Sequence, residues 1–275
     1  MPASLGKILV FVPMYNCEAQ IPRVIAQFDR SGEWPFEIAL LCVDNRSPDG
    51  TLAAAEAALA KSPVTEKYLL RNDDNYGLGG SHKVAIEFAR AHGFEYVVVL
   101  HGDDQGGFVD LLPLLERGEH LGADALLGAR FMPSATLQGY SALRTVSNHA
   151  FNVIFSAIAR KRLYDLGSGL NLFRTAMFDD GFHLKYADNL TFNYFLIFGL
   201  TDRGLRYRFF PIHWREDDQV SNAKLFSQGV AMLKLLWQRL TDKRAFHAAE
   251  HRTRAFPAYP STVVRQWSAE PAAAQ

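Results

Sequence analysis

Three short polar segments combine residue types that could bind a phosphorylated ligand. The most distinctive is 101–105, His-Gly-Asp-Asp-Gln, which directly follows the apolar run YVVVL at 96–100. The adjacent carboxylates of Asp103 and Asp104 repel each other unless they are solvated or bound to a cation. Mg²⁺ and Mn²⁺ prefer such oxygen ligands, and a divalent ion can bridge two phosphate groups. A solvated acidic turn is the alternative, but the preceding strand favours a metal site.

The second segment, 44–51, reads Asp-Asn-Arg-Ser-Pro-Asp-Gly-Thr and also follows an apolar run. A carboxylate packs poorly at the end of a buried strand, but Asp44 could accept hydrogen bonds from a ribose or a base edge. Ser-Pro-Asp-Gly is typical of a turn, and Thr51 could cap the next helix. An ordinary junction between a strand and a helix explains the segment equally well.

The third segment, 75–81, reads Asn-Tyr-Gly-Leu-Gly-Gly-Ser. Glycines ahead of a helix let the backbone approach a ligand, and a helix N-terminus favours phosphate. This is not the fingerprint of a dinucleotide-binding dehydrogenase, because that motif follows the first strand of its fold. Here the first strand runs into Met14-Tyr15-Asn16 instead. A glycine-rich turn that binds nothing is an equally good interpretation.

These segments need a scaffold that brings them together. Short apolar runs predict buried strands at 7–13, 38–43, 67–70, 96–100 and 125–127. Apolar residues at helical spacing predict helices at 18–30, 51–61, 80–92 and 111–121. The alternation indicates an α/β fold with a mainly parallel central sheet flanked by helices. Because ligands of such sheets bind beyond the carboxyl ends of the strands, a ligand is expected near the strand-exit residues 13–16, 44–50 and 101–105.

The second half of the chain is less regular. The sequence predicts a helix at 143–162, a loop entering a strand at 165–174, a strand at 206–214 and an amphipathic helix at 222–240. Pro211 indicates that its strand lies at an edge of the sheet. Residues 259–275, which end in SAEPAAAQ, are expected to form a disordered tail.

Composition narrows the class of protein. The chain has 275 residues, 48% of them hydrophobic, and 29 Lys and Arg balance 29 Asp and Glu. These values are typical of a globular protein with a sizeable core, and the balanced charge argues against a nucleic-acid partner. Cys17 and Cys42 accompany apolar runs, which favours reduced thiols and a cytoplasmic location. No signal peptide or membrane-spanning run is predicted, so any membrane contact is expected to be peripheral, at the inner face.

The order of the segments resembles that of the family-2 inverting glycosyltransferases, which have the GT-A fold, a Rossmann-like arrangement. The resemblance runs from about Ile8 to Leu240, most of the chain. The matching segments are 12–16, 43–51, 75–79, 101–105, 127–131, 165–174 and 211–224. The last of these, with Arg215, Ser221 and Lys224, is similar to a stretch of the dolichyl- and polyprenyl-phosphate sugar synthases.

The resemblance implies one GT-A domain over 1–258, with a nucleotide-binding half at 7–130 and an acceptor-binding half at 131–258. It also implies metal-dependent, inverting transfer of a sugar from a UDP- or GDP-sugar, with Mg²⁺ or Mn²⁺ as the cofactor. The favoured acceptor is a polyprenyl phosphate, in the synthesis of the cell envelope. Its phosphate oxygen is already an anion at neutral pH and could attack the anomeric carbon without a general base.

The same resemblance implies roles for individual residues. Asp103 would bind the metal, and Gln105 would contact the sugar or support the metal. The catalytic residues are expected to be Asp103, Asp104, Gln105 and Arg130. The donor is expected to contact Pro13, Tyr15, Asn16, Glu18, Asp44, Asn45, Asp49, Gly77 and Gly79. The acceptor phosphate or the donor diphosphate is expected to contact Arg130, Ser168, Arg215, Ser221 and Lys224.

Two departures from the family pattern bear on this assignment. The acidic loop of the family usually reads Asp-x-Asp-x-Gln, and His101 stands at the first acidic position. His101 could be a metal ligand, since Mn²⁺ accepts imidazole more readily than Mg²⁺ does, or a histidine that supports the site or the core. The second departure is Asn222, because the family's Gly-Ser-Lys stretch here reads Val-Ser-Asn-x-Lys.

Several alternatives stay open. Transfer to a saccharide hydroxyl would need a general base, for which Asp188 is the nearest candidate, although a solvated or helix-capping role is favoured. His101 in place of an acid would also suit a non-catalytic nucleotide-sugar-binding protein, and a nucleotidyltransferase is a weaker possibility. The helix at 222–240, followed by basic residues, could lie on a membrane surface, although packing on the core is favoured.

Overall fold

The computed structural model describes residues 5–216, 225–252 and 258–268. Its strands are β1 (Ile8–Met14), β2 (Ile38–Asp44), β3 (Glu66–Asn72), β4 (Tyr96–Leu100), β5 (Ala125–Ala129), β6 (Thr136–Gln138), β7 (Leu170–Arg174), β8 (Tyr207–Pro211), β9 (His213–Arg215) and β10 (Ser261–Trp267). Its α-helices are α1 (Ile21–Ala26), α2 (Thr51–Lys61), α3 (Gly77–Ala91), α4 (Leu112–Glu116), α5 (Ala142–Ala159), α6 (Phe192–Asp202), α7 (Leu225–Thr241) and α8 (Lys243–Ala248).

The main sheet has the order β10-β3-β2-β1-β4-β7-β5-β8, and β6 pairs with β9 separately. The strands β3, β2, β1 and β4 are parallel neighbours, whereas β7 runs antiparallel between β4 and β5. The predicted α/β fold with a mainly parallel central sheet is confirmed, and Pro211 lies in the edge strand β8, as expected.

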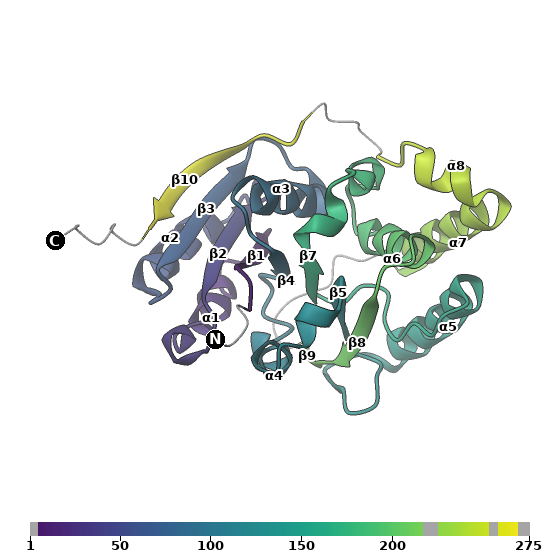
Figure 1. The fold of residues 1–275 in the computed structure, drawn as a ribbon, viewed down its shortest axis with the longest axis horizontal. Coiled ribbons are helices and arrows are strands. Elements are labelled where there is room, and N and C mark those ends of the chain that lie inside the picture. The colour runs from purple at the N-terminus through teal and green to yellow at the C-terminus, as the bar shows by residue number, and fades with distance from the viewer. Residues whose placement is uncertain (1–4, 217–224, 253–257, 269–275) are drawn as a thin grey trace.

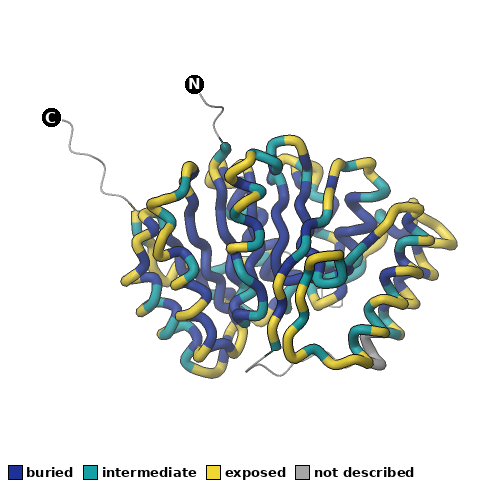
Figure 2. Tube along the Cα trace, turned by 90° about the horizontal axis from the view of Figure 1, so that it is seen from below, coloured by how far each residue is buried: buried dark blue, intermediate teal, exposed yellow. Residues whose placement is uncertain are grey.

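Helices cover both faces of the sheet (Figure 1). Along β1, Leu9 and Phe11 face a core that includes α3 and α6, whereas Ile8 and Val10 face a core that includes α1 and α2. Because both faces are buried, the strands are continuous apolar runs rather than alternating ones. The central strands are buried along most of their length, and exposure is concentrated on the outer helices (Figure 2).

The second half contains elements that periodicity did not predict. The expected strand at 206–214 divides into β8 and β9, and β9 pairs with the short strand β6. The helices α6 and α8 were not predicted. Seven residues of α6 are buried, so it lacks the apolar and polar faces from which a surface helix is recognised.

The prediction of a disordered tail at 259–275 is wrong for Ser261–Trp267. These residues form β10, which pairs antiparallel with β3 from Ser261 opposite Asn72 to Trp267 opposite Lys67. The segment STVVRQW is rich in β-branched and aromatic residues that favour strands, and it covers the otherwise open edge of β3.

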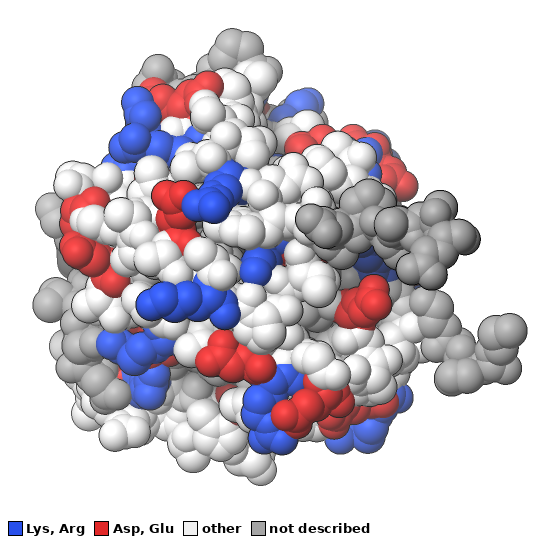
Figure 3. Space-filling model, turned by 90° about the vertical axis from the view of Figure 1, so that its left-hand side faces the viewer, with Lys and Arg blue, Asp and Glu red and all other residues white. Residues whose placement is uncertain are grey.

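The surface has the mixed charge that the composition indicates. On the face shown in Figure 3, Lys and Arg side chains alternate with Asp and Glu rather than gathering by sign. In the part of the chain that the structure describes, the helices are too short or too polar to cross a membrane.

Candidate active site

The carboxyl ends of β1, β2 and β4 meet the first residues of β7 at one edge of the sheet. Leu100, at the end of β4, lies opposite Leu170, at the start of β7. The backbone N–H of His101 donates to the carbonyl of Gly169 at 3.0 Å, and that of Gly102 donates to the carbonyl of Pro13 at 3.1 Å. The acidic loop 101–105 is therefore held between β1 and the start of β7, the two strands that flank β4. Parallel sheets commonly bind ligands at this end of their strands.

Asp103 and His101 lie close together at the start of this loop. His101 Nδ1 is 3.9 Å from Asp103 Oδ2, and both side chains are mostly buried. Burial raises the pKa of Asp103 to about 6. Burial also lowers the pKa of His101 to about 4, and the Arg130 guanidinium adds to that effect. At neutral pH the pair is a carboxylate beside a neutral imidazole, and these are the protonation states that bind metal ions.

These two side chains fit a divalent cation. A carboxylate oxygen and a neutral imidazole nitrogen are donors that Mn²⁺ accepts, and here they lie 3.9 Å apart. A cation would also offset the burial of the Asp103 carboxylate. Within the described ranges, no cluster of three His, Cys, Asp or Glu side chains could hold a metal. An ion held here would take its other ligands from substrate phosphate and water, as Mg²⁺ commonly does.

We expect Mn²⁺ to bind about tenfold more weakly at pH 5 than at pH 7, because protons compete for Asp103 below its pKa of about 6. The raised pKa means that neutral Asp103 stabilises the metal-free fold at low pH and that this contribution is lost as the pH rises through 6. Bound Mn²⁺ should therefore raise the melting temperature more at pH 7 than at pH 5.

Calorimetric titration of Mn²⁺ in the presence of UDP, at both pH values, measures this effect. The control is Asp103→Asn, in which the pH dependence should vanish. Equal Mn²⁺ affinity at pH 5 and pH 7 in the unmodified protein would exclude Asp103 as a ligand.

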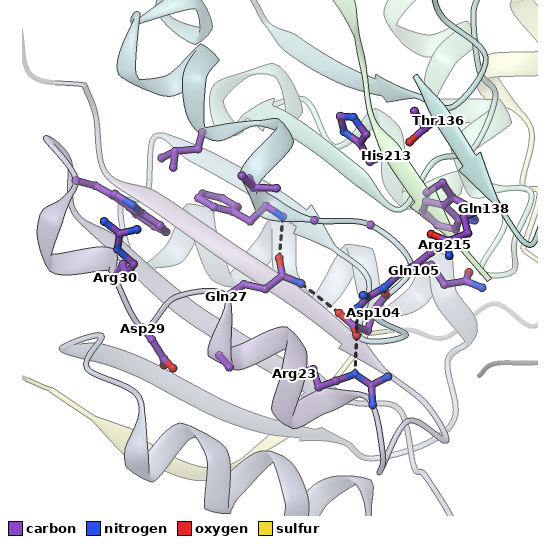
Figure 4. Close-up of a pocket in the computed structure, with 18 of the residues that line it drawn as sticks. Arg23, Gln27, Asp29, Arg30, Asp104, Gln105, Thr136, Gln138, His213 and Arg215 are labelled. Atoms are coloured by element: carbon purple, nitrogen blue, oxygen red, sulfur yellow. Dashed lines mark hydrogen bonds and ion pairs between the residues drawn. The ribbon is translucent and has the colours of Figure 1, made fainter. Parts of the chain in front are cut away.

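The side chain of Asp104 points toward Arg23 of α1 (Figure 4). Its backbone φ is +58°, a left-handed conformation that turns its side chain to the opposite side of the loop. Its Oδ2 accepts hydrogen bonds from Arg23 Nε at 2.7 Å and from the Arg215 guanidinium, and Gln27 lies 3.4 Å from its Oδ1. The two carboxylates therefore do not form one paired site, and Asp104 is engaged in protein contacts.

Asp104 and Gln105 line a cavity of about 820 Å³ between α1, α4 and the β6–β9 pair. The rings of Trp34 and Phe108 stack in its wall, with their centroids 5.2 Å apart. Its charged lining is mixed, with arginines beside aspartates and glutamates (Figure 4). Gln105 accepts a hydrogen bond from the backbone N–H of Arg215 through its carbonyl, at 3.0 Å.

Arg130 is fixed by a buried ion pair. Its Nε and Nη2 donate to the two carboxylate oxygens of Asp165 at 2.8 and 2.9 Å, and its backbone N–H also donates to Asp165. Burial alone would raise the pKa of Asp165, but Arg130 outweighs burial and holds that pKa below its usual range. The guanidinium also lies 5.1 Å from the ring of Trp214 and influences both Asp103 and His101. It is a preorganised cation beside the proposed metal pair.

Ser168 is nearby but is engaged within its own turn. It is buried, and its hydroxyl donates to the carbonyl of Leu170 at 3.2 Å. The next residue, Gly169, leaves room for the His101 ring, because a Cβ there would lie 2.8 Å from that ring. The Ser-Gly segment therefore shapes the loop beside His101, and an acceptor contact by Ser168 stays a prediction.

Asp44, predicted to contact the donor, has one carboxylate oxygen that accepts no described hydrogen bond. It is fully buried at the exit of β2, and its Oδ1 accepts from the backbone N–H of Ser47 at 3.2 Å. Its Oδ2 lies 3.4 Å from Arg71 Nε and has no hydrogen-bond partner among the described residues. The Arg71 guanidinium offsets the charge of this buried oxygen, and a contact between Asp44 and a base or a ribose stays a prediction.

Hydrogen bonds join the loop after β1 to the loop after β2, and they involve other residues that were predicted to contact the sugar donor. The backbone N–H of Asn16 donates to Ser47, and Glu18 accepts from the backbone N–H of Gly50. Asp49 accepts from Thr51 at the start of α2. Asn45 joins Asn72, Asn75 and Tyr76. These contacts give the residues a structural role, whereas Tyr15 is exposed and Pro13 partly exposed beside them.

The glycines of the third segment pack against the protein's own backbone. A Cβ at Gly77 would lie 2.5 Å from the carbonyl oxygen of Asp188, and a Cβ at Gly79 would collide with that of Ala187. The backbone N–H of Gly80 also donates to the Asp188 carbonyl, at 3.2 Å. Packing of α3 against 187–188 therefore explains glycines that we expected to approach a ligand.

Asp188 is held in a buried network. Its Oδ1 accepts from Lys83 Nζ at 2.6 Å and from the Tyr259 hydroxyl at 2.8 Å. Lys83 is fully buried, and burial lowers its pKa to about 8. The expectation of a solvated or capping Asp188 is wrong, because this carboxylate is paired with a lysine inside the fold.

Two predicted phosphate contacts, Ser221 and Lys224, lie outside the described residues. Arg215 is described, and it binds the carbonyl of Asp104 at 3.0 Å as well as the Asp104 carboxylate. The sequence did not predict a role for Asp165, although this residue begins the matching segment 165–174. Arg71 and Lys83 were also missed, and neither carries a sequence signal that separates it from an ordinary exposed cation.

The chain is similar to several known proteins. The model of the family described as "Glycosyl transferase family 2" matches residues 9–182. A polyprenol monophosphomannose synthase of Mycolicibacterium smegmatis is 24% identical over 168 residues, which are 61% of this chain and 62% of that protein. An undecaprenyl-phosphate mannosyltransferase of Micrococcus luteus is 24% identical over 61% of this chain and 66% of its own length. The chain thus matches less than two thirds of either relative.

Solved structures share the fold. The glucosyl-3-phosphoglycerate synthase of M. tuberculosis superposes with a TM-score of 0.60 at 17% identity, covering 89% of this chain and 81% of that one. At that identity the similarity defines the fold, which is that of the GT-A glycosyltransferases.

Proposed function

The chain belongs to glycosyl transferase family 2, and from that membership we propose that it transfers a sugar from a UDP- or GDP-sugar to a polyprenyl phosphate, with inversion and with a divalent metal. The similarity to two enzymes named for polyprenyl phosphates supports this acceptor. The M. tuberculosis synthase of the same fold was solved with Mn²⁺ and UDP, which supports the choice of cofactor and donor class.

The state of the carboxylates is the observation that carries the choice of acceptor. A saccharide hydroxyl must lose a proton and needs a carboxylate that is free to take it. Among the carboxylates described above, Asp104 is bonded to two arginines and Asp165 to Arg130. Lys83 binds Oδ1 of Asp188, whose other oxygen is buried, and Asp103 is assigned to the metal. A phosphate acceptor is already an anion and needs no base, so it suits a site in which most carboxylates are engaged.

The proposed step needs positioning and charge neutralisation. A phosphate oxygen of the acceptor forms a bond to the anomeric carbon while the bond from that carbon to the diphosphate breaks. The nucleoside diphosphate then leaves with the electron pair, and no proton moves. Asp103 and His101 would hold the metal, which neutralises the leaving diphosphate when it is bound. Arg130, fixed by Asp165, would attract the acceptor phosphate.

We expect radiolabelled sugar to move from its nucleotide to a polyprenyl phosphate in detergent when Mn²⁺ or Mg²⁺ is present, and not in EDTA. The labelled product should partition into organic solvent and release its sugar in mild acid. A soluble saccharide acceptor is tested in parallel. Label that appears only on the saccharide would overturn the choice of acceptor, and release of free sugar alone would reject both acceptors.

The donor is found by thermal shift. A ligand that binds only the folded state raises the melting temperature by mass action, so UDP-, GDP- and dTDP-sugars are compared with and without Mn²⁺. The largest stabilisation identifies the nucleotide. A protein that binds a donor without transferring or hydrolysing it would instead be a nucleotide-sugar-binding protein.

A further inference from the structure

The outward side of α5 is apolar, the reverse of an ordinary surface helix. Leu143, Val146, Ala150, Val153 and Ala157 recur at intervals of three and four residues, and all five are exposed. The opposite side of the helix is buried through Asn152, Phe155 and Ala159. This helix therefore presents an apolar stripe to the surroundings as well as to the core.

The helix α7 has the same property. Val230, Leu233, Trp237 and Leu240 form a second exposed stripe, and Trp237 is 69% exposed. Its buried side, with Met232, Leu235 and Leu236, belongs to the core. The expected amphipathic helix is thus apolar on both sides, so packing on the core does not account for all of its apolar residues.

The two helices lie side by side at one end of the molecule (Figure 1). A Cβ at Gly229 of α7 would lie 3.6 Å from the ring of Phe151 of α5. Further along, Arg239 Nη1 donates to the carbonyl of Ile158 at 3.1 Å. Both contacts advance in the same direction along the chain, so the helices run parallel and their stripes lie on the same outer side. We call these two stripes together the α5–α7 face.

The exposed charges around this face are mainly positive. Neither α5 nor α7 contains Asp or Glu. Exposed cations flank the stripes at Lys234 and, where both helices end, in a group consisting of Arg160, Lys161, Arg162 and Arg244. Lys243 is also exposed there, but it pairs with Asp202 at 3.0 Å. Asp242 directly follows α7, and its side chain caps α8 by accepting a hydrogen bond from the backbone N–H of Ala245. An apolar surface bordered by cations is complementary to an anionic lipid bilayer.

We propose that the α5–α7 face docks on an anionic membrane surface, with the aliphatic side chains and Trp237 at the level of the lipid headgroups. A tryptophan favours that level because its ring is largely apolar and its N–H is polar. A second copy of the chain fits the face less well. It would bring the same cations and no acidic side chain from either helix to pair with them.

Docking would place lipid beside the candidate acceptor site. Arg144 of α5 forms an ion pair with Glu216, the neighbour of Arg215, at 2.5 Å. Asn148 of α5 donates to the hydroxyl of Tyr140, and the Arg130 guanidinium lies 5.8 Å from the Tyr140 ring. The bilayer and Arg130 would then be separated by α5, which is about 10 Å across, and by the Tyr140 side chain. This benefit to catalysis rests on the proposed polyprenyl phosphate acceptor, whereas the docking itself does not.

Flotation with vesicles, in the absence of substrates, tests the docking. The full chain should float with vesicles containing phosphatidylglycerol and much less with vesicles of phosphatidylcholine alone, and salt should weaken the binding. The double variant Leu233→Glu/Trp237→Glu should reduce the bound fraction at least tenfold. The matched control is Val263→Glu, at an exposed apolar position of β10, which should bind like the unmodified protein.

Melting temperatures equal within a few degrees would show that the variants fold. Unchanged flotation of the Leu233/Trp237 variant would overturn the proposal. So would a dimer in solution that the double variant converts to a monomer, because the face would then bind a second copy. Transfer to a short-chain, water-soluble polyprenyl phosphate separates the two hypotheses. If the protein does not float with vesicles but still transfers sugar to this acceptor, docking is rejected and the proposed function stands. If it floats but does not transfer sugar, the proposed function is rejected and docking stands.

Discussion

Asp103→Asn is expected to reduce sugar transfer by about 10²–10³-fold while leaving the fold intact, a loss typical of removing one electrostatic contact to the reacting groups. Its carboxylate lies beside neutral His101 at the carboxyl edge of the sheet, where a metal would bridge the protein and the donor diphosphate. The hydrogen bond that its side chain accepts from the backbone N–H of Gln105, at 3.3 Å, can also be accepted by an asparagine oxygen. Initial rates at saturating donor, with Mn²⁺, measure the effect.

Asp104→Asn is the matched control, because it makes the same change one residue away. Asp104 is bonded to Arg23 and Arg215 and turns toward α1. We expect the Asp104→Asn substitution to lower the free energy of unfolding by about 1–3 kcal/mol, because it weakens a buried contact. The variant should bind Mn²⁺ with the affinity of the unmodified protein. If Asp104→Asn abolished Mn²⁺ binding and Asp103→Asn did not, the assignment of the metal to Asp103 would be wrong.

Asp165→Asn is expected to lower the free energy of unfolding by about 3–5 kcal/mol, the range for breaking a buried ion pair. It would leave the Arg130 guanidinium in the interior without its carboxylate partner. The pKa of Asp165 is held low, so the pair stabilises the protein above the unfolded-state pKa and this contribution is lost as the pH falls. Urea denaturation at pH 7, followed by circular dichroism, measures the change.

Two further variants interpret that result. The control is Asp29→Asn, an exposed carboxylate on α1's side of the fold, which should change stability by less than about 0.5 kcal/mol. Replacing both partners, as Arg130→Met/Asp165→Leu, should recover much of the stability, because two apolar side chains leave no buried charge. Transfer to polyprenyl phosphate should stay low in that double variant. Restored transfer would mean that Arg130 only supports the fold.

Much of the fold follows from local patterns. The continuous apolar runs at β1, β2 and β4 reflect burial on both faces, and the helices between them imply parallel pairing. Parallel pairing in turn places Asp44 and the acidic loop at one edge. For this reason the α/β arrangement of the first half of the chain and the position of Asp103 at the end of β4 could be predicted without coordinates.

Partners distant in sequence could not be predicted. The side chain of Asp188 meets Lys83, Gly79 packs on the chain at 187, and β10 completes the sheet at β3. Each contact joins segments that are far apart in the sequence, and none leaves a periodic signal at either end. Periodicity reports whether a side chain is buried but not which side chain it meets.

The acidic loop 101–105 shows what the sequence can predict and what it cannot. The sequence by itself determined that a carboxylate follows β4, because the apolar run ends there and polar groups must begin. Only the tertiary structure decided that Asp103 joins His101 while Asp104 joins two arginines. The physical reason is the left-handed backbone at Asp104, which is stabilised by contacts to α1 and β9 that the local sequence does not encode.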